Sequence, residues 1–351
     1  MKGLVIGDYL LPTEVLEGFF HGDGIEEFIT SYEKTDFVVK TRAEIRNVWR
    51  QLELHGPSGV PYPEAMPQMV EDAEVLVVHI CPVCREIIQR AKKLKLIVSA
   101  RGGLENIDLE EATKRGIPVI HTPHHNANAV AEYTVGMMLA ETRNIARSHL
   151  ALREGKWQEF YPNSSFIPEL AELKVGIVGF GQNGQLVCEK LRSFDTTILV
   201  SDPFVADDAI RQAGFIPMKL EELLREADIV SLHVRLTKQT ERMIGEGEFA
   251  LMKPTAYLIN TARSGLVDTQ ALIGALKNKV IQGAAIDVFD TEPLPADSEL
   301  TRLENLTATN HRAGDTRASY WNAPNLMRKQ ALKLFRGETP RFVANRQVLE
   351  K

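Results

Sequence analysis

The chain has 351 residues, which allows two or three domains that each have a hydrophobic core. Its composition is ordinary for a globular protein, and its net charge of −6 gives no reason to expect nucleic-acid or membrane partners. Apolar runs stay well short of the roughly 18 residues that cross a membrane, and the three cysteines are too few for a disulfide framework. We therefore expect a cytoplasmic protein.

The first 123 residues alternate between short apolar runs and segments with helical spacing. We expect strands at residues 4–6, 37–39, 75–80, 96–98 and 118–120, and helices at residues 14–20, 43–53, 84–91 and 109–115. The proline-rich stretch at 55–67 is expected to be a loop. Alternation of this kind predicts an α/β unit with a parallel sheet.

Polar features follow the third and fourth of these strands. Cys81 and Cys84 form one C-x-x-C pair without a second pair, so we interpret them as structural cysteines and predict no metal site. His79 ends the third strand and is predicted to line a substrate cleft. The fourth strand leads into Arg101-Gly102-Gly103, where exposed N–H groups and a guanidinium suit a substrate carboxylate. The alternative for this loop is an ordinary turn with a solvent-facing arginine.

A turn with two histidines, His124 and His125, precedes a long helix predicted for residues 129–154. Either histidine could contact a substrate, although loop histidines are more often solvated. The helix has a broader apolar surface than one packing partner requires. We therefore predict that it packs against its own domain and against a second copy of the chain.

Residues 173–202 have the pattern of a strand, a glycine-rich turn, a helix and a second strand, in that order. Gly179, Gly181 and Gly184 have the G-x-G-x-x-G spacing of dinucleotide-binding loops. The first glycine permits a tight turn, the second lets the backbone approach a pyrophosphate, and the third lets the helix pack against the strand. The alternative is a tight turn that binds nothing.

The flanking residues of this loop extend the prediction. Gln182 and Asn183 lead into a helix predicted for residues 185–194, and free N–H groups at a helix N-terminus suit a pyrophosphate. Asp202 ends the second strand, where its carboxylate would accept hydrogen bonds from a ribose and repel a 2′-phosphate. This arrangement favours NAD over NADP.

The second half of the chain continues the alternation. We expect strands at residues 229–233, 256–260, 283–288 and 306–308, and helices at residues 220–226, 249–252, 269–278 and 320–337. Arg263, Glu292 and His311 each follow one of these strands, and the carboxyl ends of parallel strands converge on one crevice. Arginine can hold a carboxylate, histidine can donate a proton, and a carboxylate beside the imidazole orients it. These residue types suit hydride transfer to a 2-oxo acid. The alternative is that the three residues form only surface salt bridges.

Seven segments resemble the D-isomer-specific 2-hydroxyacid dehydrogenases, a family that includes phosphoglycerate and glycerate dehydrogenases. They are ENIDLEEATKRGIPVIHTP (105–123), NANAVAEYTVGMML (126–139), VGIVGFGQNG (175–184), ADIVSLHVRLT (227–237), LINTARSGLVD (258–268), GAAIDVFDTEPLP (283–295) and NHRAGDT (310–316). The resemblance implies a two-domain α/β fold, with a Rossmann NAD-binding domain inserted in a discontinuous flavodoxin-like substrate domain. We expect the substrate domain at 1–123 and 311–351, the NAD-binding domain at 124–310, and a homodimer built on the helix near 129–150.

The resemblance also implies roles for single residues. The catalytic groups fall on Arg263, Glu292 and His311. The cofactor contacts fall on the glycine loop with Gln182 and Asn183, and on Asp202, His233, Thr261 and Asp287. The substrate contacts fall on His79, Arg101, Gly102 and Gly103. Four positions depart from the family pattern: Arg101 replaces a glycine, Ser264 a glycine and Asn310 a proline, and Arg235 replaces a proline near the adenine, which could relax the preference for NAD.

These observations lead to one expected activity and two alternatives. We expect an NAD-dependent oxidoreductase that interconverts a D-2-hydroxy acid and its 2-oxo acid. The first alternative is an NAD(H)-sensing binding protein, as in the corepressors that resemble the family. The second is a formate- or phosphonate-type dehydrogenase on the same fold, although Glu292 beside a histidine fits a reaction that must move a proton. The polar residues near His79 favour a polyhydroxy acid over an alkyl one.

Overall fold

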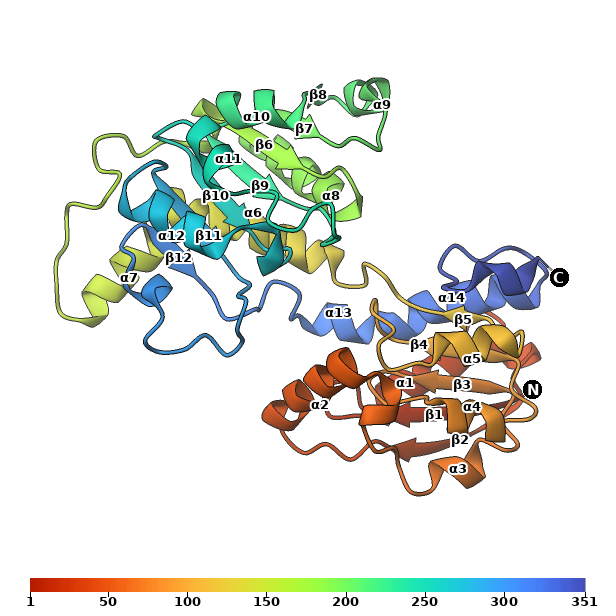
Figure 1. Cartoon of the computed structure of the whole chain (residues 1–351). Helices are drawn as coiled ribbons and strands as arrows, with labels where there is room; N and C mark the ends of the chain where they lie inside the picture. Colours follow the sequence, from red (N-terminus) through yellow and green to blue (C-terminus); the bar gives the residue numbers. More distant parts are fainter. Residues whose placement is uncertain (351) are drawn as a thin grey trace. The chain divides into compact units, whose positions relative to one another are not determined.

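The computed structural model describes residues 1–350, leaving aside the side chains at positions 42, 43 and 46, and the chain forms two compact units (Figure 1). Unit 1 comprises Met1–Asn126 together with the C-terminal segment that begins at Thr316, and unit 2 comprises Ala127–Asp315. Within the described range, no helix is long and apolar enough to cross a membrane.

Unit 1 contains a five-stranded parallel sheet in the order β2-β1-β3-β4-β5. Its strands are β1 (Lys2–Gly7), β2 (Ser31–Asp36), β3 (Val75–Val78), β4 (Leu96–Ser99) and β5 (Val119–Ile120). This is the flavodoxin-like order, in which the chain leaves β1 toward one edge of the sheet and returns through β3 on the other side of β1. The order therefore places a topological switch point between β1 and β3.

Helices cover both faces of this sheet because successive residues of a strand point to opposite sides. They are α1 (Thr13–Leu16), α2 (Arg42–His55), α3 (Met66–Met69), α4 (Arg85–Arg90), α5 (Leu109–Lys114), α13 (Arg317–Trp321) and α14 (Ala323–Phe335). Leu4 and Ile6 of β1 share a buried cluster with α4, whereas Val5 shares one with Met327 and Ala331 of α14. The C-terminal helix thus completes the core that the N-terminal strand begins.

The second strand lies ahead of its predicted position, so the prediction for residues 37–39 is wrong. The observed strand β2 is polar and pairs with β1 along its whole length. As an edge strand it buries few side chains, so it carries no apolar run. Phe37 and Val39 are buried just after the strand, while Val38 is 74% exposed. The apolar run at residues 37–39 therefore reflects the burial of Phe37 and Val39, which follow the strand.

The long helix predicted for residues 129–154 is two helices, α6 (Ala127–Thr142) and α7 (Ile145–Arg153). The chain breaks at Asn144, whose φ of 57° is left-handed, a conformation that asparagine tolerates better than most residues. The buried amide of Asn144 donates a hydrogen bond to Asn163 Oδ1 over 2.7 Å. The break also brings Arg147 to the buried Glu141, with 2.6 Å between Nη2 and Oε1. Local polar contacts therefore override the continuous helical pattern.

The helix predicted for residues 320–337 is also divided. It forms α13 and α14, with Asn322 between them. Pro324 lies in the first turn of α14, where its missing N–H costs no helical hydrogen bond, whereas a proline within one continuous helix would lose such a bond. The proline therefore explains the division.

Unit 2 contains a seven-stranded parallel sheet in the order β12-β11-β10-β9-β6-β7-β8. Its strands are β6 (Lys174–Val178), β7 (Thr197–Ser201), β8 (Ile216–Pro217), β9 (Ile229–Leu232), β10 (Tyr257–Asn260), β11 (Gly283–Ile286) and β12 (Leu306–Ala308). From β8 to β11 this is the doubly wound order of dinucleotide-binding sheets, and β12 extends it. The predicted fold class is confirmed.

Helices again cover both faces of the sheet in unit 2 (Figure 1). Besides α6 and α7 they are α8 (Gln182–Leu191), α9 (Asp207–Gln212), α10 (Leu220–Glu226), α11 (Glu246–Leu251) and α12 (Thr269–Lys277). Val175 and Ile177 of β6 share a buried cluster with α6 and α8, whereas Val178 shares one with α10, α11 and α12. The sheet is thus buried on both faces, which matches its continuous apolar strands.

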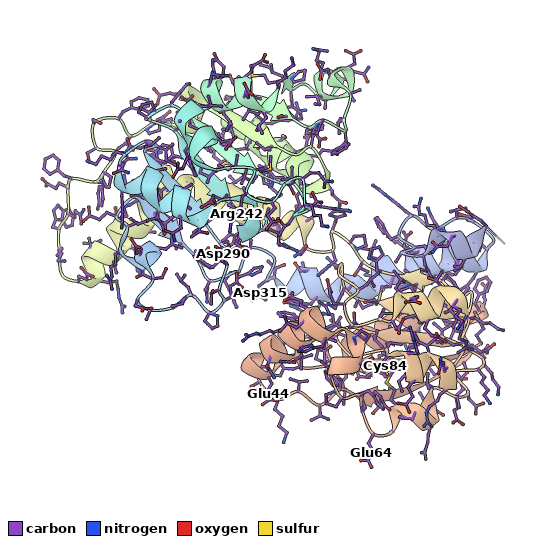
Figure 2. The ribbon with its side chains drawn as sticks, in the orientation of Figure 1. Glu44, Glu64, Cys84, Arg242, Asp290 and Asp315 are labelled. Carbon is purple, nitrogen blue, oxygen red and sulfur yellow. The ribbon has the colours of Figure 1, made fainter. Side chains whose placement is uncertain are left out.

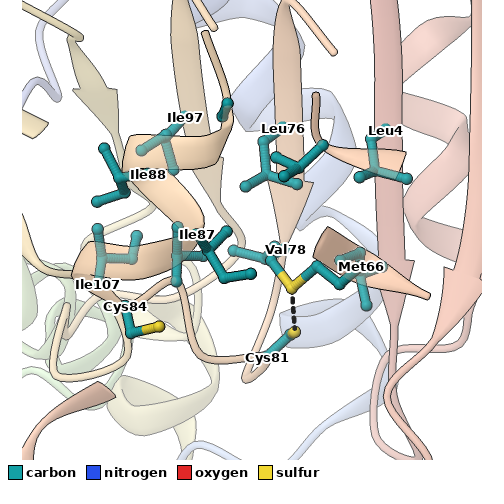
Figure 3. Close-up of a cluster of buried hydrophobic side chains, with 14 of the residues drawn as sticks. Leu4, Met66, Leu76, Val78, Cys81, Cys84, Ile87, Ile88, Ile97 and Ile107 are labelled. Carbon is teal, nitrogen blue, oxygen red and sulfur yellow. Dashed lines mark hydrogen bonds between the residues drawn. The ribbon is translucent and has the colours of Figure 1, made fainter. Parts of the chain in front are cut away.

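All three cysteines are buried free thiols. Cys81 lies in the apolar cluster beside α4, with its Sγ 3.9 Å from Met66 Sδ (Figure 3). Burial raises the pKa of Cys81 well above its ordinary value and that of Cys188 to about 12. Both therefore stay protonated and behave as small apolar side chains. Across residues 1–350, no group of three His, Cys, Asp or Glu side chains is arranged to hold a metal ion.

Candidate functional site

The three glycines of the predicted dinucleotide loop meet three different demands in unit 2. Gly179 has a φ of 98°, and a Cβ there would lie 2.9 Å from the backbone of His233. A Cβ on Gly184 would overlap the carbonyl oxygen of Gly179, so helix α8 can pack this close only with glycine. Around Gly181, in contrast, a Cβ would meet nothing within 4 Å. The loop thus has one open position, where the backbone can approach a pyrophosphate.

Helix α8 begins directly after this open glycine. Its first residue is Gln182, three residues earlier than predicted, and no side chain caps its N-terminal N–H groups. Gln185 ties the loop to the helix, with 2.9 Å between its Nε2 and the carbonyl oxygen of Phe180. The Oδ1 atom of Asn183 is buried and has no hydrogen-bond partner among the described residues. Uncapped N–H groups at this N-terminus fit an anionic pyrophosphate.

Asp202 follows β7 and holds the loop from the other side. Its Oδ2 accepts a hydrogen bond from Phe180 N over 2.7 Å, and its Oδ1 accepts one from Phe204 N over 2.8 Å. Each carboxylate oxygen can accept a second hydrogen bond, so the group can still bind ribose hydroxyls. The side chain of Phe204 is 96% exposed beside it. Asp202 therefore has a structural role in addition to the predicted cofactor contact.

His233 and Thr261 follow β9 and β10 at the same edge of the sheet. The Nε2 atom of His233 lies 2.9 Å from Ser231 Oγ, and burial lowers the pKa of His233 to about 4. The hydroxyl of Thr261 lies 2.7 Å from that of Thr134 on α6. Thr134 in turn donates to the carbonyl of Val130. The hydroxyl of Thr261 is thus engaged within the protein, and its predicted contact with the cofactor stays a prediction.

The half-buried His233 predicts a loss of stability in acid. Because its folded pKa of about 4 lies below the ordinary 6.5, only the unfolded chain binds this proton as the pH falls from 6.5 to 4. We expect this histidine to remove about 2–3 kcal/mol of the unfolding free energy over that window. Urea unfolding of the wild type and of His233→Gln at several pH values measures the difference. Equal pH dependence in both proteins would contradict the assignment.

Asp287 follows β11 and is fully buried. Its oxygens accept hydrogen bonds from Thr309 Oγ1 over 2.6 Å, Arg312 N over 2.9 Å and Ala313 N over 2.7 Å. These three donors flank His311, so the carboxylate anchors the loop that carries the histidine. A contact between Asp287 and the cofactor stays a prediction.

His311 and Glu292 form a hydrogen-bonded pair. The Nδ1 atom of His311 lies 2.8 Å from Glu292 Oε2, and Glu292 Oε1 accepts a hydrogen bond from Phe289 N over 3.1 Å. His311 has a φ of 55°, in the left-handed region. This backbone conformation is strained for residues other than glycine. Both side chains are partly exposed, at 51% for His311 and 36% for Glu292. With Nδ1–H donated to the carboxylate, Nε2 of the imidazole points away from the pair and can reach a ligand.

Arg263 lies at the carboxyl end of β10, beside the β11 strand that precedes Glu292. Its side chain is exposed and donates to the carbonyl of Ala262 over 2.7 Å. The structure thus brings Glu292 and His311 into contact and places Arg263 at the end of the neighbouring strand. The charged fork of Arg263 suits a carboxylate or a keto oxygen.

A cavity of about 400 Å³ lies under the loop that carries Glu292, between that loop and α12. Asp290, labelled in Figure 2, lines it and accepts a hydrogen bond from Thr269 Oγ1 over 2.6 Å. None of the predicted catalytic, cofactor-binding or substrate-binding residues lines this cavity. The predicted site residues therefore lie outside this cavity.

In unit 1, the predicted substrate residues lie at the carboxyl ends of β3 and β4. His79 is 3% exposed, and its Nδ1 lies 2.8 Å from Asp8 Oδ2. The sequence analysis does not single out Asp8. Its position directly after β1 was the available signal, because β1 and β3 are neighbours in a flavodoxin-like sheet. His79 is therefore a buried, paired histidine and not a loosely held one.

The glycine loop of unit 1 already holds a carboxylate of the protein itself. Glu105 Oε2 lies 3.3 Å from Arg101 Nη2, and a Cβ on Gly103 would lie 2.5 Å from the same oxygen. Burial lowers the pKa of Arg101, and its Nη1 is buried without a hydrogen-bond partner in the described part of the chain. His125, on the next turn, is kept neutral because burial lowers its pKa to about 4. The loop thus pairs with Glu105 of the chain itself, and its predicted contact with a substrate carboxylate stays a prediction.

Comparison with known proteins extends these observations. The family model described as "D-isomer specific 2-hydroxyacid dehydrogenase, NAD binding domain" matches residues 135–313. Glyoxylate reductase of Thermofilum pendens is 41% identical over 270 residues, which are 76% of this chain and 79% of that protein. D-3-phosphoglycerate dehydrogenase of Methanocaldococcus jannaschii is 37% identical over 284 residues, 80% of this chain and 53% of that protein.

The fold has a close counterpart among solved structures. The NAD-complexed D-isomer-specific 2-hydroxyacid dehydrogenase of Lactobacillus delbrueckii ssp. bulgaricus superposes with a TM-score of 0.77 at 23% identity, covering 98% of this chain and 100% of that one. This likeness shows the fold, and the sequence matches show the family. The protein is an NAD-dependent oxidoreductase. More particularly, it belongs to the D-isomer-specific 2-hydroxyacid dehydrogenases, and its cofactor is NAD.

Proposed function

We propose that the protein reduces a 2-oxo acid to a D-2-hydroxy acid with NADH, with His311 and Glu292 as the acid–base pair. The observation that supports this most is the 2.8 Å contact between the two side chains at the carboxyl edge of the sheet in unit 2. The glycine loop lies at the same edge, after β6. Relatives named glyoxylate reductase and D-3-phosphoglycerate dehydrogenase act on acids of this class.

Each group in unit 2 has a proposed role. When bound, the reduced nicotinamide supplies the hydride. Arg263 holds the acid and polarises its keto oxygen, because a guanidinium offers several donors in one plane. His311 carries a proton on Nε2 and gives it to the oxygen as the carbonyl is reduced. Glu292 accepts the hydrogen bond from Nδ1, so it orients the ring.

In unit 1, we propose that Arg101, Gly102 and Gly103 can bind a carboxylate in place of Glu105. The buried, unpartnered Nη1 atom of Arg101 supports this role, because a buried donor without a partner is costly unless a ligand satisfies it. We propose that unit 1 is the substrate domain and unit 2 the NAD-binding domain; the boundaries expected from the sequence, after residues 123 and 310, lie three and five residues before those of the units.

Oxidation of NADH in the presence of 2-oxo acids tests the proposed reaction. The panel contains glyoxylate, hydroxypyruvate, pyruvate, 2-oxobutyrate and phosphohydroxypyruvate. We expect steady-state turnover of at least one, with a D-configured product identified by chiral chromatography. Tight NADH binding without turnover of any of these acids would contradict the proposal.

We also propose that the protein is a homodimer. The segment from α7 onward carries a set of exposed apolar side chains, between 44% and 83% accessible: Ile145, Leu150, Leu152, Trp157, Phe160, Phe166 and Ile167. A monomer rarely leaves so many large apolar groups exposed along one segment. A symmetric dimer would bury this segment of both copies in one interface. The proposed interface therefore lies on α7 and the loop after it.

A charge placed in this segment should weaken the dimer. We expect Trp157→Glu to shift the protein toward a monomer, because a dimer would bury the new carboxylate in an apolar contact. Sedimentation equilibrium gives the mass directly. Val38→Glu is the control, since Val38 is 74% exposed in unit 1. A wild-type monomer, or a Trp157→Glu dimer as tight as the wild type, would contradict the proposed interface.

A further inference from the structure

The cavity under the Glu292 loop has the size of a small-molecule site. Its volume is about 400 Å³, and every residue that lines it belongs to unit 2. Sites for small organic ligands are clefts of about 300–1,000 Å³, mostly apolar, with a few polar groups that fix the ligand. None of the roles assigned above uses this space, so its own lining must show which ligand it suits.

The deep part of the cavity is apolar. Helix α12 and strand β11 supply most of it, and the following side chains line it while being only 3–7% exposed: Val267, Leu272, Ile273, Ile286 and Val288. An apolar group is favoured in such a place, because it leaves water for a surface that offers no hydrogen bonds. The ligand that fits therefore has an apolar body.

The mouth of the cavity carries negative charge. Asp290, Asp297 and Glu299 line it and are exposed, and no Lys, Arg or His lies among the described residues of the lining. Glu299 forms an ion pair with Lys277. Within the described residues, Asp290 accepts a hydrogen bond from Thr269 Oγ1 over 2.6 Å but has no cationic partner. The charges of Asp290 and Asp297 are thus left unbalanced at the mouth.

The N-terminus of α12 does not turn the cavity into an anion site. Thr269 and Gln270 line the cavity, and free N–H groups at a helix N-terminus can bind an anion. Here, however, the Asp268 side chain accepts hydrogen bonds from Gln270 N over 3.0 Å and Ala271 N over 3.1 Å. A carboxylate of the chain itself already caps this helix, so the N-terminus adds no preference for an anionic ligand.

One wall of the cavity is the loop that carries Glu292. Residues 288–291 and 294–295 line the cavity on both sides of Glu292 in the sequence, whereas Glu292 itself pairs with His311. The backbone N–H of Phe289, a lining residue, donates to Glu292 Oε1 over 3.1 Å. A ligand in the cavity would therefore contact the loop that positions the partner of His311.

We propose that this cavity is an effector site for a small organic cation with an apolar body. Its N–H donors bind Asp290 and Asp297 at the mouth, and its body packs against Ile273 and the other apolar side chains. Hydrogen bonds between a cation and a carboxylate are stronger than neutral ones, so a neutral molecule of the same shape binds more weakly. Binding changes the reaction rate through the Glu292 loop. The binding is independent of the proposed reaction, whereas the effect on the rate rests on it.

Benzamidine and benzamide test the charge preference. The two molecules have the same shape and differ in that benzamidine is a cation at pH 7 and benzamide is neutral. Isothermal titration calorimetry of the full chain should give a Kd for benzamidine at least ~10-fold below that for benzamide. Equal affinities, or no binding of benzamidine at millimolar concentrations, would overturn the inference.

Variants locate the binding. Asp290→Asn keeps an acceptor for the Thr269 hydroxyl and removes the charge, so it should raise the Kd for benzamidine at least ~5-fold, as should Asp297→Asn. Asp208→Asn, at a carboxylate that is 86% exposed on α9, is the matched control and should bind as the wild type does. Glu292→Gln should also bind normally. Loss of binding in Glu292→Gln but not in Asp290→Asn would place benzamidine at the catalytic pair and refute the site.

Initial rates with NADH and a 2-oxo acid test the effector role. Saturating benzamidine should change kcat at least ~2-fold in the wild type and leave kcat of Asp290→Asn unchanged at the same concentration. An unchanged rate in a wild-type protein saturated with benzamidine would refute the effector role. A protein that binds benzamidine but reduces no 2-oxo acid would refute the proposed reaction, and with it the effect on the rate, while the cation site would stand.

Discussion

Replacing His311 with alanine should lower kcat/KM for the 2-oxo acid by about 10²–10⁴-fold, the range attributed to a positioned general acid. The affinity for NADH should stay unchanged, because His311 follows β12 whereas the glycine loop follows β6. The side chain is 51% exposed, so its loss should not destabilise the fold. Initial rates and quenching of protein fluorescence by NADH measure the two effects separately.

Two further variants separate the proton donor from its support. His311→Asn keeps a donor to Glu292 and tolerates the left-handed φ of 55°, but it has no group at Nε2. It should therefore be as inactive as His311→Ala. Glu292→Gln keeps the shape of the pair and removes the charge from the acceptor of the Nδ1 hydrogen bond, so the ring is held less firmly and an intermediate loss is expected. Turnover by His311→Asn near the wild-type rate would show that the proton comes from another group.

Sequence reasoning located the buried strands well because their signal is local. A strand covered on both faces is an apolar run, and β3, β4, β9 and β10 all begin and end within two residues of their predicted bounds. The edge strand β2 has no such signal, and its place depends on the pairing with β1. Strand β8, at one edge of the sheet in unit 2, was not predicted for the same reason.

Site residues could be predicted from the sequence where their position directly after a strand was enough to single them out. The contact between Glu292 and His311 was expected, because both follow adjacent strands of one parallel sheet. The roles of Asp8 and Asp287 could not be read from the chain. Asp8 lies 71 positions from the histidine it holds, and the donors to Asp287 lie 22 to 26 positions away. Such residues stand out only when the hydrogen bonds are known, because an aspartate after a strand has many possible partners.

Alanine substitution at Gly181 and at Gly184 should give opposite results, although the two residues are three positions apart. At Gly184 the new Cβ would overlap the carbonyl oxygen of Gly179, a backbone atom that cannot move without shifting β6 or α8. We expect Gly184→Ala to lower the unfolding free energy by about 1–3 kcal/mol, as overpacking does in other cores. Its NADH affinity should fall as well, because the loop moves.

At Gly181 the new Cβ would meet nothing within 4 Å in the protein, and the φ of −70° suits alanine. Gly181→Ala should therefore keep its full stability. The methyl group would instead occupy the space through which the pyrophosphate approaches the backbone, so the Kd for NADH should rise at least ~10-fold. Urea unfolding and NADH titration distinguish the two variants. If Gly181→Ala bound NADH as tightly as the wild type, the open face of the loop would not be where the cofactor's phosphates lie.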